Sequence, residues 1–136
     1  MDAFALTPAE RALFAALRER GIKFLIVGLG AAVLEGAPVA TQDLDLWFES
    51  LDGNQLALAA KGAGGFGLSG IDVVLTAHGL RAFADEYDGS VERKIEGVTV
   101  RVLPLERVIA SKRATGRPKG AASLPALEAT LRVKRC

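Results

Sequence analysis

The spacing of apolar residues changes along the chain, and these changes predict the order of its elements. Residues 7–10 (Thr-Pro-Ala-Glu) have the cap, proline and glutamate that begin a helix. Leu13, Phe14 and Leu17 then recur at helical spacing. Residues 22–27 (Ile-Lys-Phe-Leu-Ile-Val) are apolar and rich in β-formers, which predicts a central strand. Residues 28–30 (Gly-Leu-Gly) then turn the chain into a short helix over about 31–35.

Residues 43–49 alternate strictly, as a strand does that is half-buried in a sheet. One side would hold Leu44, Leu46 and Phe48, and the other Asp43, Asp45, Trp47 and Glu49. The remaining pattern predicts helices over 54–61, 80–87, 104–114 and 121–134, a loop over 62–70, and strands over 71–75, 91–95 and 98–103, the last two joined by a hairpin at Glu96-Gly97. This order predicts an α/β or α+β fold, a sheet with helices packed on it.

Length and composition bound the class of protein. A chain of 136 residues is long enough for one core, so we expect a single domain over 1–136. Half of the residues are hydrophobic and 24% are charged, as in globular proteins. We expect no membrane span, because no apolar run reaches the roughly 18 residues required. Without a signal-like start, and with Cys136 as the sole cysteine, the simplest location is cytoplasmic.

Charge is distributed unevenly, although the net charge is only +1. Residues 43–96 carry ten Asp or Glu against four Lys or Arg, and residues 101–136 carry nine Lys or Arg against two Glu. An acidic middle followed by a basic tail suits a site for a cation and a polyphosphate. The same counts also describe two solvated faces of opposite sign.

The acidic middle contains one candidate metal site. Residues i and i+2 of a strand point to the same side, so Asp43 and Asp45 are neighbours on one face. Asp72 begins the 71–75 strand and joins them if the two strands pair. Carboxylate oxygens of this kind suit Mg²⁺ or Mn²⁺. An acid-x-acid pair alone is weak, since chance supplies about two in such a chain; Glu86 and Asp88 form another, and solvated aspartates are the alternative.

The glycine segment supplies a candidate phosphate site. Glycine lets the backbone approach a ligand, and the N–H groups at the start of a helix suit phosphate. Residues 28–33 (Gly-Leu-Gly-Ala-Ala-Val) also match part of the dinucleotide fingerprint, with Glu49 as the following acid. That interpretation is the weaker one, because Gly36 and Pro38 end the helix early. A tight turn without a ligand is the third interpretation.

Together, these motifs resemble the DNA polymerase β-like nucleotidyltransferase superfamily, and within it the small bacterial members related to minimal nucleotidyltransferases and AbiEii-type toxins. The resemblance rests on residues 24–36 with their Gly turn and on residues 41–46 (Thr-Gln-Asp-Leu-Asp-Leu). It extends to residues 71–74 (Ile-Asp-Val-Val), 103–113 and 116–119 (Gly-Arg-Pro-Lys), and so covers most of the chain.

The resemblance implies Mg²⁺ or Mn²⁺ held by Asp43, Asp45 and Asp72, and a nucleoside triphosphate whose phosphates lie at Gly28 and Leu29. Lys112 would contact the nucleotide from the late helix. The expected activity is transfer of a nucleoside monophosphate to an acceptor hydroxyl of a protein, a tRNA or a small molecule.

One departure from the family pattern leaves an alternative open. Leu29 stands where the family prefers Gly or Ser, which favours a non-catalytic binding module with a toxin–antitoxin or defence partner. Val39 replaces a basic residue common in relatives, and Gly120 replaces an acid. A homodimer is compatible with either interpretation.

Overall fold

The computed structural model describes residues 8–39, 44–49, 71–74, 79–116 and 118–135. The helices are α1 (Pro8–Glu19), α2 (Gly28–Leu34), α4 (Phe83–Asp88), α5 (Leu105–Thr115) and α6 (Pro118–Arg135). The strands are β1 (Phe24–Val27), β2 (Leu44–Phe48), β3 (Ile71–Val74), β4 (Val91–Ile95) and β5 (Val98–Val102). The helix expected over 54–61 and the loop over 62–70 lie outside the described residues.

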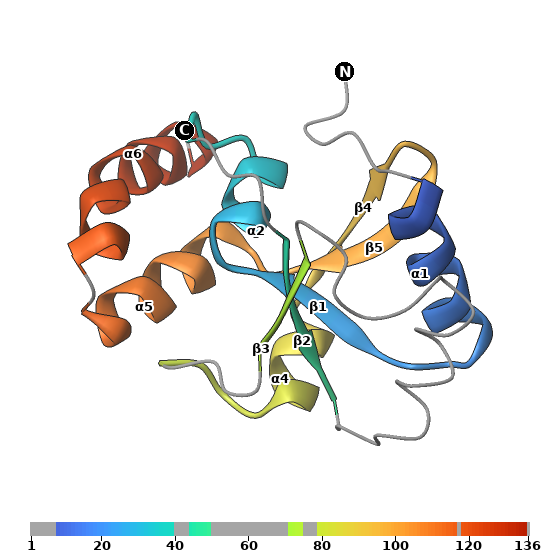
Figure 1. Ribbon diagram of the computed structural model, residues 1–136. Helices are drawn as coiled ribbons and strands as arrows, with labels where there is room; N and C mark the ends of the chain where they lie inside the picture. The colour runs from blue at the N-terminus through green and yellow to red at the C-terminus, as the bar shows by residue number, and fades with distance from the viewer. Residues whose placement is uncertain (1–7, 40–43, 50–70, 75–78, 117, 136) are drawn as a thin grey trace.

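The five strands form one mixed sheet in the order β3-β2-β1-β5-β4 (Figure 1). β1 is antiparallel to β2 and parallel to β5, β2 is parallel to β3, and β4 is antiparallel to β5. The predicted hairpin joins β4 to β5 through Glu96 (φ 49°) and Gly97 (φ 85°). Two consecutive positive φ values are what a tight hairpin of this twist requires. The expected fold class, α/β with helices packed on a mixed sheet, is confirmed.

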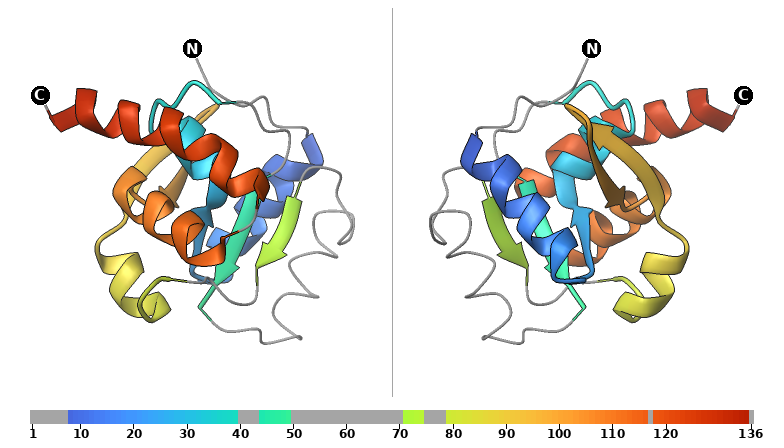
Figure 2. Two further views of the ribbon diagram at one scale, coloured as in Figure 1. Left: turned by 90° about the vertical axis from the view of Figure 1, so that its left-hand side faces the viewer. Right: turned by 90° about the vertical axis from the view of Figure 1, so that its right-hand side faces the viewer.

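Helices cover both faces of the sheet. α1 packs on one face, where the Phe14 ring stacks on Phe24 with the ring centroids 5.5 Å apart. α4 packs on the other face, where Phe83 meets Trp47 edge-on at 5.2 Å. α5 and α6 pack against each other beside α2, at the end of the sheet where β1 leads into that helix (Figures 1 and 2). Within the described residues, no helix is long and apolar enough to cross a membrane.

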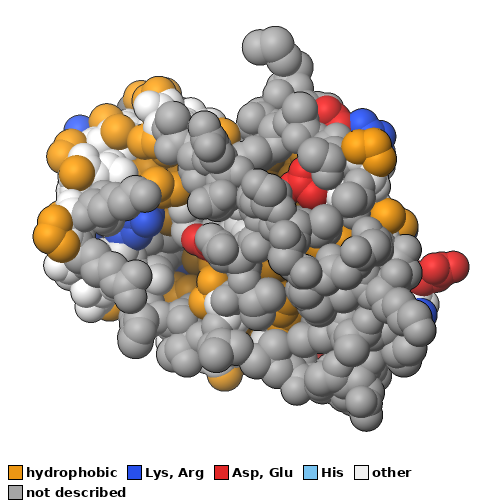
Figure 3. All heavy atoms as spheres, viewed as in Figure 1, with side chains coloured by type: hydrophobic (Ala, Val, Ile, Leu, Met, Phe, Trp, Pro, Cys, Tyr) orange, Lys and Arg blue, Asp and Glu red, His pale blue; other side chains and the backbone are white. Residues whose placement is uncertain are grey.

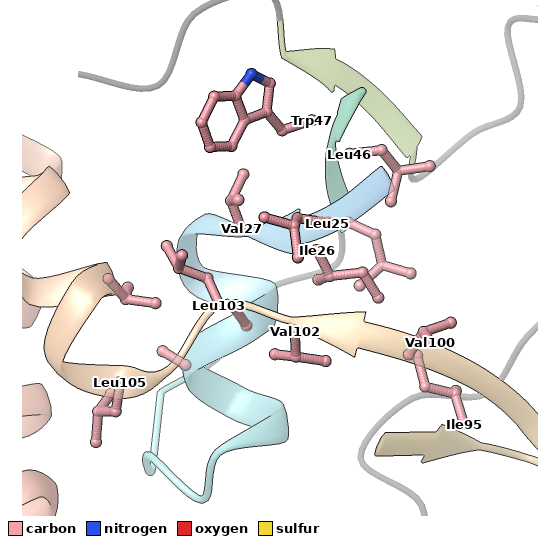
Figure 4. Close-up of a cluster of buried hydrophobic side chains, with 14 of the residues drawn as sticks. Leu25, Ile26, Val27, Leu46, Trp47, Ile95, Val100, Val102, Leu103 and Leu105 are labelled. Atoms are coloured by element: carbon pink, nitrogen blue, oxygen red, sulfur yellow. The ribbon is translucent and has the colours of Figure 1, made fainter. Parts of the chain in front are cut away.

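The core runs through the middle of the sheet, where Leu25, Ile26 and Val102 are completely buried (Figure 4). β2 differs from the half-buried strand that its alternation predicts. Four of its five side chains are buried, and Asp45 alone is partly exposed. The reason is that β2 lies between β1 and β3, and α4 covers the face on which its polar positions lie. A single carboxylate therefore interrupts an otherwise buried strand.

Candidate active site

The end of β1 and the start of β2 meet at a close contact between Gly28 and Asp45. Val27 is the register partner of Asp45 in the antiparallel pair, and Gly28 follows with a φ of 67°. A Cβ atom built on Gly28 would lie 2.6 Å from Asp45 Oδ2, nearer than non-bonded atoms approach. Glycine is favoured here by its φ, and any larger residue would also require the Asp45 carboxylate to turn aside. The Asp45 carboxylate therefore lies directly against the backbone of the turn that begins α2.

β3 brings a second predicted acidic position next to Asp45. The two strands are parallel, and Asp72 is the register partner of Asp45. Neighbouring strands lie about 4.8 Å apart, and register partners belong to the same face of a sheet. The strand that contains Asp72 therefore pairs next to the strand that contains Asp45, as the predicted acidic site requires.

The complete acidic set lies partly among the residues that the structure does not describe (grey in Figure 3). Asp43 is outside the described residues, as is the side chain of Asp72. In the described part of the chain, no three His, Cys, Asp or Glu side chains gather into a group that could hold a metal ion. The metal site at Asp43, Asp45 and Asp72 therefore stays a prediction, with Asp45 as its described member.

The other two predicted ligand-binding residues lie on α2 and α5. Leu29 is in the first turn of α2, and its side chain is partly buried. Lys112 is partly buried on α5, which packs against α2. The chain also approaches α5 after β3, since a Cβ on Gly79 would lie 2.5 Å from Ala114 Cβ and 3.0 Å from Ala110 O. Lys112 thus belongs to the helix that contacts both the glycine turn and the segment after Asp72.

Trp47 is on the same face of β2 as Asp45, but it is not available to stack on a base. Its side chain is only 8% exposed and packs edge-on against Phe83 of α4. Trp47 therefore covers the sheet beside Asp45. This edge-on contact between aromatic rings holds α4 on the face of the sheet to which Asp45 belongs.

Glu86 provides an ion pair that sequence reasoning missed. It is 5% exposed and accepts hydrogen bonds from Arg107 Nε at 3.0 Å and Nη2 at 2.7 Å, and from the Arg81 N–H at 2.9 Å. The hydrogen bonds from Arg107 hold the pKa of Glu86 below its ordinary value, and the pKa of Arg107 is raised in return. This pair ties α4 to α5. The Glu86-x-Asp88 spacing therefore marks a structural contact and not a second acidic site, since Asp88 is exposed.

A second buried carboxylate fixes the far end of α2. Glu35 accepts a hydrogen bond from Arg93 Nε at 3.0 Å, and Lys134 Nζ donates to its backbone carbonyl at 2.7 Å. A cation at the C-terminal end of a helix also meets the negative end of the helix dipole. The end of α2 is therefore joined both to α6 and to β4.

Two solved structures are similar to this chain in overall fold. A crystal structure of ANT(2″)-Ia in complex with adenylyl-2″-tobramycin matches with a TM-score of 0.59 and 19% identity, over 92% of this chain and 88% of that one. A solution structure of the antibiotic-resistance factor ANT(2″)-Ia, described as showing substrate-regulated conformation dynamics, matches with a TM-score of 0.54 and 18% identity, over 93% and 91%. Both are aminoglycoside nucleotidyltransferases.

This chain has the nucleotidyltransferase fold. The likeness confirms the fold that the sequence predicts, and at such identity it carries no more than the fold. No protein-family model matches the chain, and no curated protein does. The narrower resemblance to minimal nucleotidyltransferases and AbiEii-type toxins therefore stays a prediction.

The direction of β2 excludes the dinucleotide-binding interpretation of the glycine turn. That fold requires a strand, a helix and a second strand parallel to the first. Here α2 leads from β1 into an antiparallel neighbour. The partial match of residues 28–33 to the fingerprint is therefore coincidental.

Proposed function

We propose that this protein is a metal-dependent nucleotidyltransferase that moves a nucleoside monophosphate from a nucleoside triphosphate to an acceptor hydroxyl. The observation that carries the proposal is the contact of Asp45 Oδ2 with the glycine turn at Gly28, in a chain with the nucleotidyltransferase fold. This contact brings a carboxylate suited to a divalent cation next to backbone that a phosphate can approach.

Asp43, Asp45 and Asp72 are the proposed ligands of Mg²⁺ or Mn²⁺. Their donor atoms fit such a cation, because all are hard carboxylate oxygens. The sequence spacing puts Asp43 and Asp45 on one face, and the register puts Asp72 opposite Asp45. When bound, the metal would neutralise charge on the triphosphate and on the departing pyrophosphate.

The remaining residues of the proposed site position the triphosphate and the acceptor. The backbone at Gly28 and Leu29 lies at the phosphates, and Lys112 supplies a positive charge from α5. The acceptor oxygen forms a bond to the α-phosphorus while the bond from that phosphorus to the bridging oxygen breaks, and pyrophosphate leaves. Asp72 orients the acceptor and takes the proton from its hydroxyl group.

The acceptor to test first is an aminoglycoside. ANT(2″)-Ia was crystallised with an adenylylated tobramycin, and it shares the fold over nine-tenths of this chain. Proteins and tRNA are the other two classes of acceptor, and each offers hydroxyl groups.

The test is transfer of labelled monophosphate from each nucleoside triphosphate to an aminoglycoside, a protein mixture or tRNA, with Mg²⁺ or Mn²⁺. Asp45→Asn should abolish most of the transfer, because the amide oxygen carries no charge for the cation. Asp88→Asn is the matched control: it changes an exposed acid of the other acid-x-acid pair and should leave the rate unchanged. Equal labelling by wild type and Asp45→Asn would contradict the proposal.

A non-catalytic binding module is the second candidate, favoured by Leu29. The partly buried isobutyl group stands at the turn where the triphosphate would bind. Calorimetry separates the two functions. Binding of Mg²⁺ and ATP supports the enzyme, whereas no binding of either at millimolar concentration supports a module that works through a protein partner.

A further inference from the structure

A pocket lies at the end of β1 that is opposite to Gly28. Its volume is about 390 Å³, which is in the range of small-ligand sites. The pocket is lined by Arg18 at the end of α1, the turn into β1, Tyr87 of α4, Glu92 of β4 and residues 99–101 of β5. None of the residues proposed for nucleotidyl transfer lines it.

The pocket exists because β1 and β5 diverge. These parallel strands are joined at one register pair, Ile26 with Val102, beside which the Leu103 N–H donates to Ile26 O at 2.9 Å. From there toward their N-terminal ends the strands separate (Figure 1). The turn before β1 leaves one wall open, since a Cβ on Gly21 would meet nothing within 4 Å.

Three cationic side chains from three elements line this opening. Tyr87 fixes two of them, with Lys23 Nζ 5.5 Å and Arg101 Cζ 5.4 Å from its ring centroid. Ser90 orients Arg101 further, because its hydroxyl accepts from Nε at 2.7 Å and its carbonyl accepts from Nη2 at 3.0 Å. Both cations line one pocket, so an anion bound there would be attracted by the two charges together.

The third cation, Arg18, is exposed, and its guanidinium makes no hydrogen bond or ion pair with the residues that the structure describes. Two carboxylates lie near the cations. Glu92 is the register partner of Arg101, and Glu49 lies 4.0 Å from Lys23, where both side chains are about half exposed. Exposed pairs at that distance contribute little. The lining therefore has three cations against one carboxylate.

We propose that this pocket binds a phosphate group. A phosphate presents three acceptor oxygens and a charge of about −1.5 to −2, more than a single carboxylate offers to three converging cations. Arginine forms paired hydrogen bonds with phosphate oxygens, and Arg101 is held in place before any ligand arrives. The proposal is independent of nucleotidyl transfer, because the site lies at the other end of β1.

The test is titration of the intact protein with inorganic phosphate, followed by amide NMR shifts and calorimetry. The shifts should appear at Gly21 and Thr99 and not at the Gly28 turn. Arg18→Gln should weaken binding about tenfold, the loss expected for one charge-assisted hydrogen bond. Arg20→Gln is the matched control, because it removes an equally exposed charge that does not line the pocket and should leave the affinity unchanged.

A variant that binds phosphate more tightly is also needed, because a misfolded variant would lose affinity for a trivial reason. Glu92→Gln removes the opposing carboxylate and should tighten phosphate binding several-fold, most clearly at low salt. Tighter binding of AMP than of phosphate would assign the site to a nucleotide, and equal binding would assign it to free phosphate; both support the proposal. The proposal is overturned by shifts confined to the Gly28 turn, by equal affinities of Arg18→Gln and Arg20→Gln, or by no binding at millimolar phosphate.

Discussion

Replacing Gly28 by alanine tests the contact on which the proposed site depends. The added Cβ has two costs. The backbone must hold a φ of 67°, a left-handed conformation that costs an L residue about 1–2 kcal/mol. The Cβ must also push aside Asp45 Oδ2, which would lie 2.6 Å away, and turning that side chain off its rotamer costs about 0.5–1.5 kcal/mol. We expect Gly28→Ala to lower the free energy of unfolding by about 1.5–3.5 kcal/mol.

Gly21→Ala separates the two costs. Gly21 has a φ of 66°, and a Cβ there meets nothing within 4 Å. This variant should therefore lose only the backbone part, about 1–2 kcal/mol. Urea unfolding followed by circular dichroism gives both values. The difference between the two variants measures the contact with Asp45.

The double variant Gly28→Ala/Asp45→Ala identifies the atom responsible. Removing the carboxylate makes room for the new Cβ, so the double variant should be more stable than the sum of the single changes predicts. Equal losses for Gly28→Ala and Gly21→Ala, or strict additivity in this cycle, would refute the argument that Asp45 lies against the turn.

Four other predictions concern the residues around the site. Arg107→Met leaves Glu86 buried without its partner and should cost about 3–5 kcal/mol in urea unfolding. The pKa of Glu86 is lowered in the folded state, so its stabilising contribution should be present above its ordinary pKa of 4.5 and should disappear as pH falls through the folded pKa. In Glu86→Gln, the free energy of unfolding should lack this dependence on pH. Lys134→Met should lower the melting temperature by an amount equivalent to about 1 kcal/mol, whereas Arg132→Met on the same exposed end of α6 should not. Trp47, the single tryptophan, should resist acrylamide quenching and keep its emission when ATP is added.

Local pattern predicted those elements whose boundaries are set by local chemistry. The hairpin at Glu96-Gly97 and the helix after Pro104 occur where the sequence places them, because turns and caps depend on neighbouring residues. Two helices begin three residues before their predicted starts. α2 begins directly at Gly28, and α6 begins at Pro118, since proline is compatible with the first helical position.

Contacts between distant residues were beyond the reach of the pattern. Glu86 looked like half of a chance acidic pair, and its partner Arg107 lies 21 residues away on another helix. Lys134 is one of nine basic residues in 101–136, and nothing in the pattern indicates that it contacts the end of α2, 99 residues earlier. Such pairings depend on which helix covers which face of the sheet, and helical spacing alone does not contain that information. Within the candidate site, the sequence predicted the glycine turn and the acidic strand. Only the strand register shows that Asp45 lies next to Gly28.

Asp45 lies next to Gly28 because β2 runs antiparallel to β1. Gly28 follows the last residue of β1, and Asp45 is among the first residues of β2. If β2 ran parallel to β1, as in a dinucleotide-binding unit, its start would lie beside the start of β1, four residues or about 13 Å from the glycine turn. Because β2 runs back along β1, its first carboxylate lies against the turn instead. The glycine segment therefore has a carboxylate beside it, as the proposed function requires, and it cannot serve a dinucleotide in the manner that its sequence partly resembles.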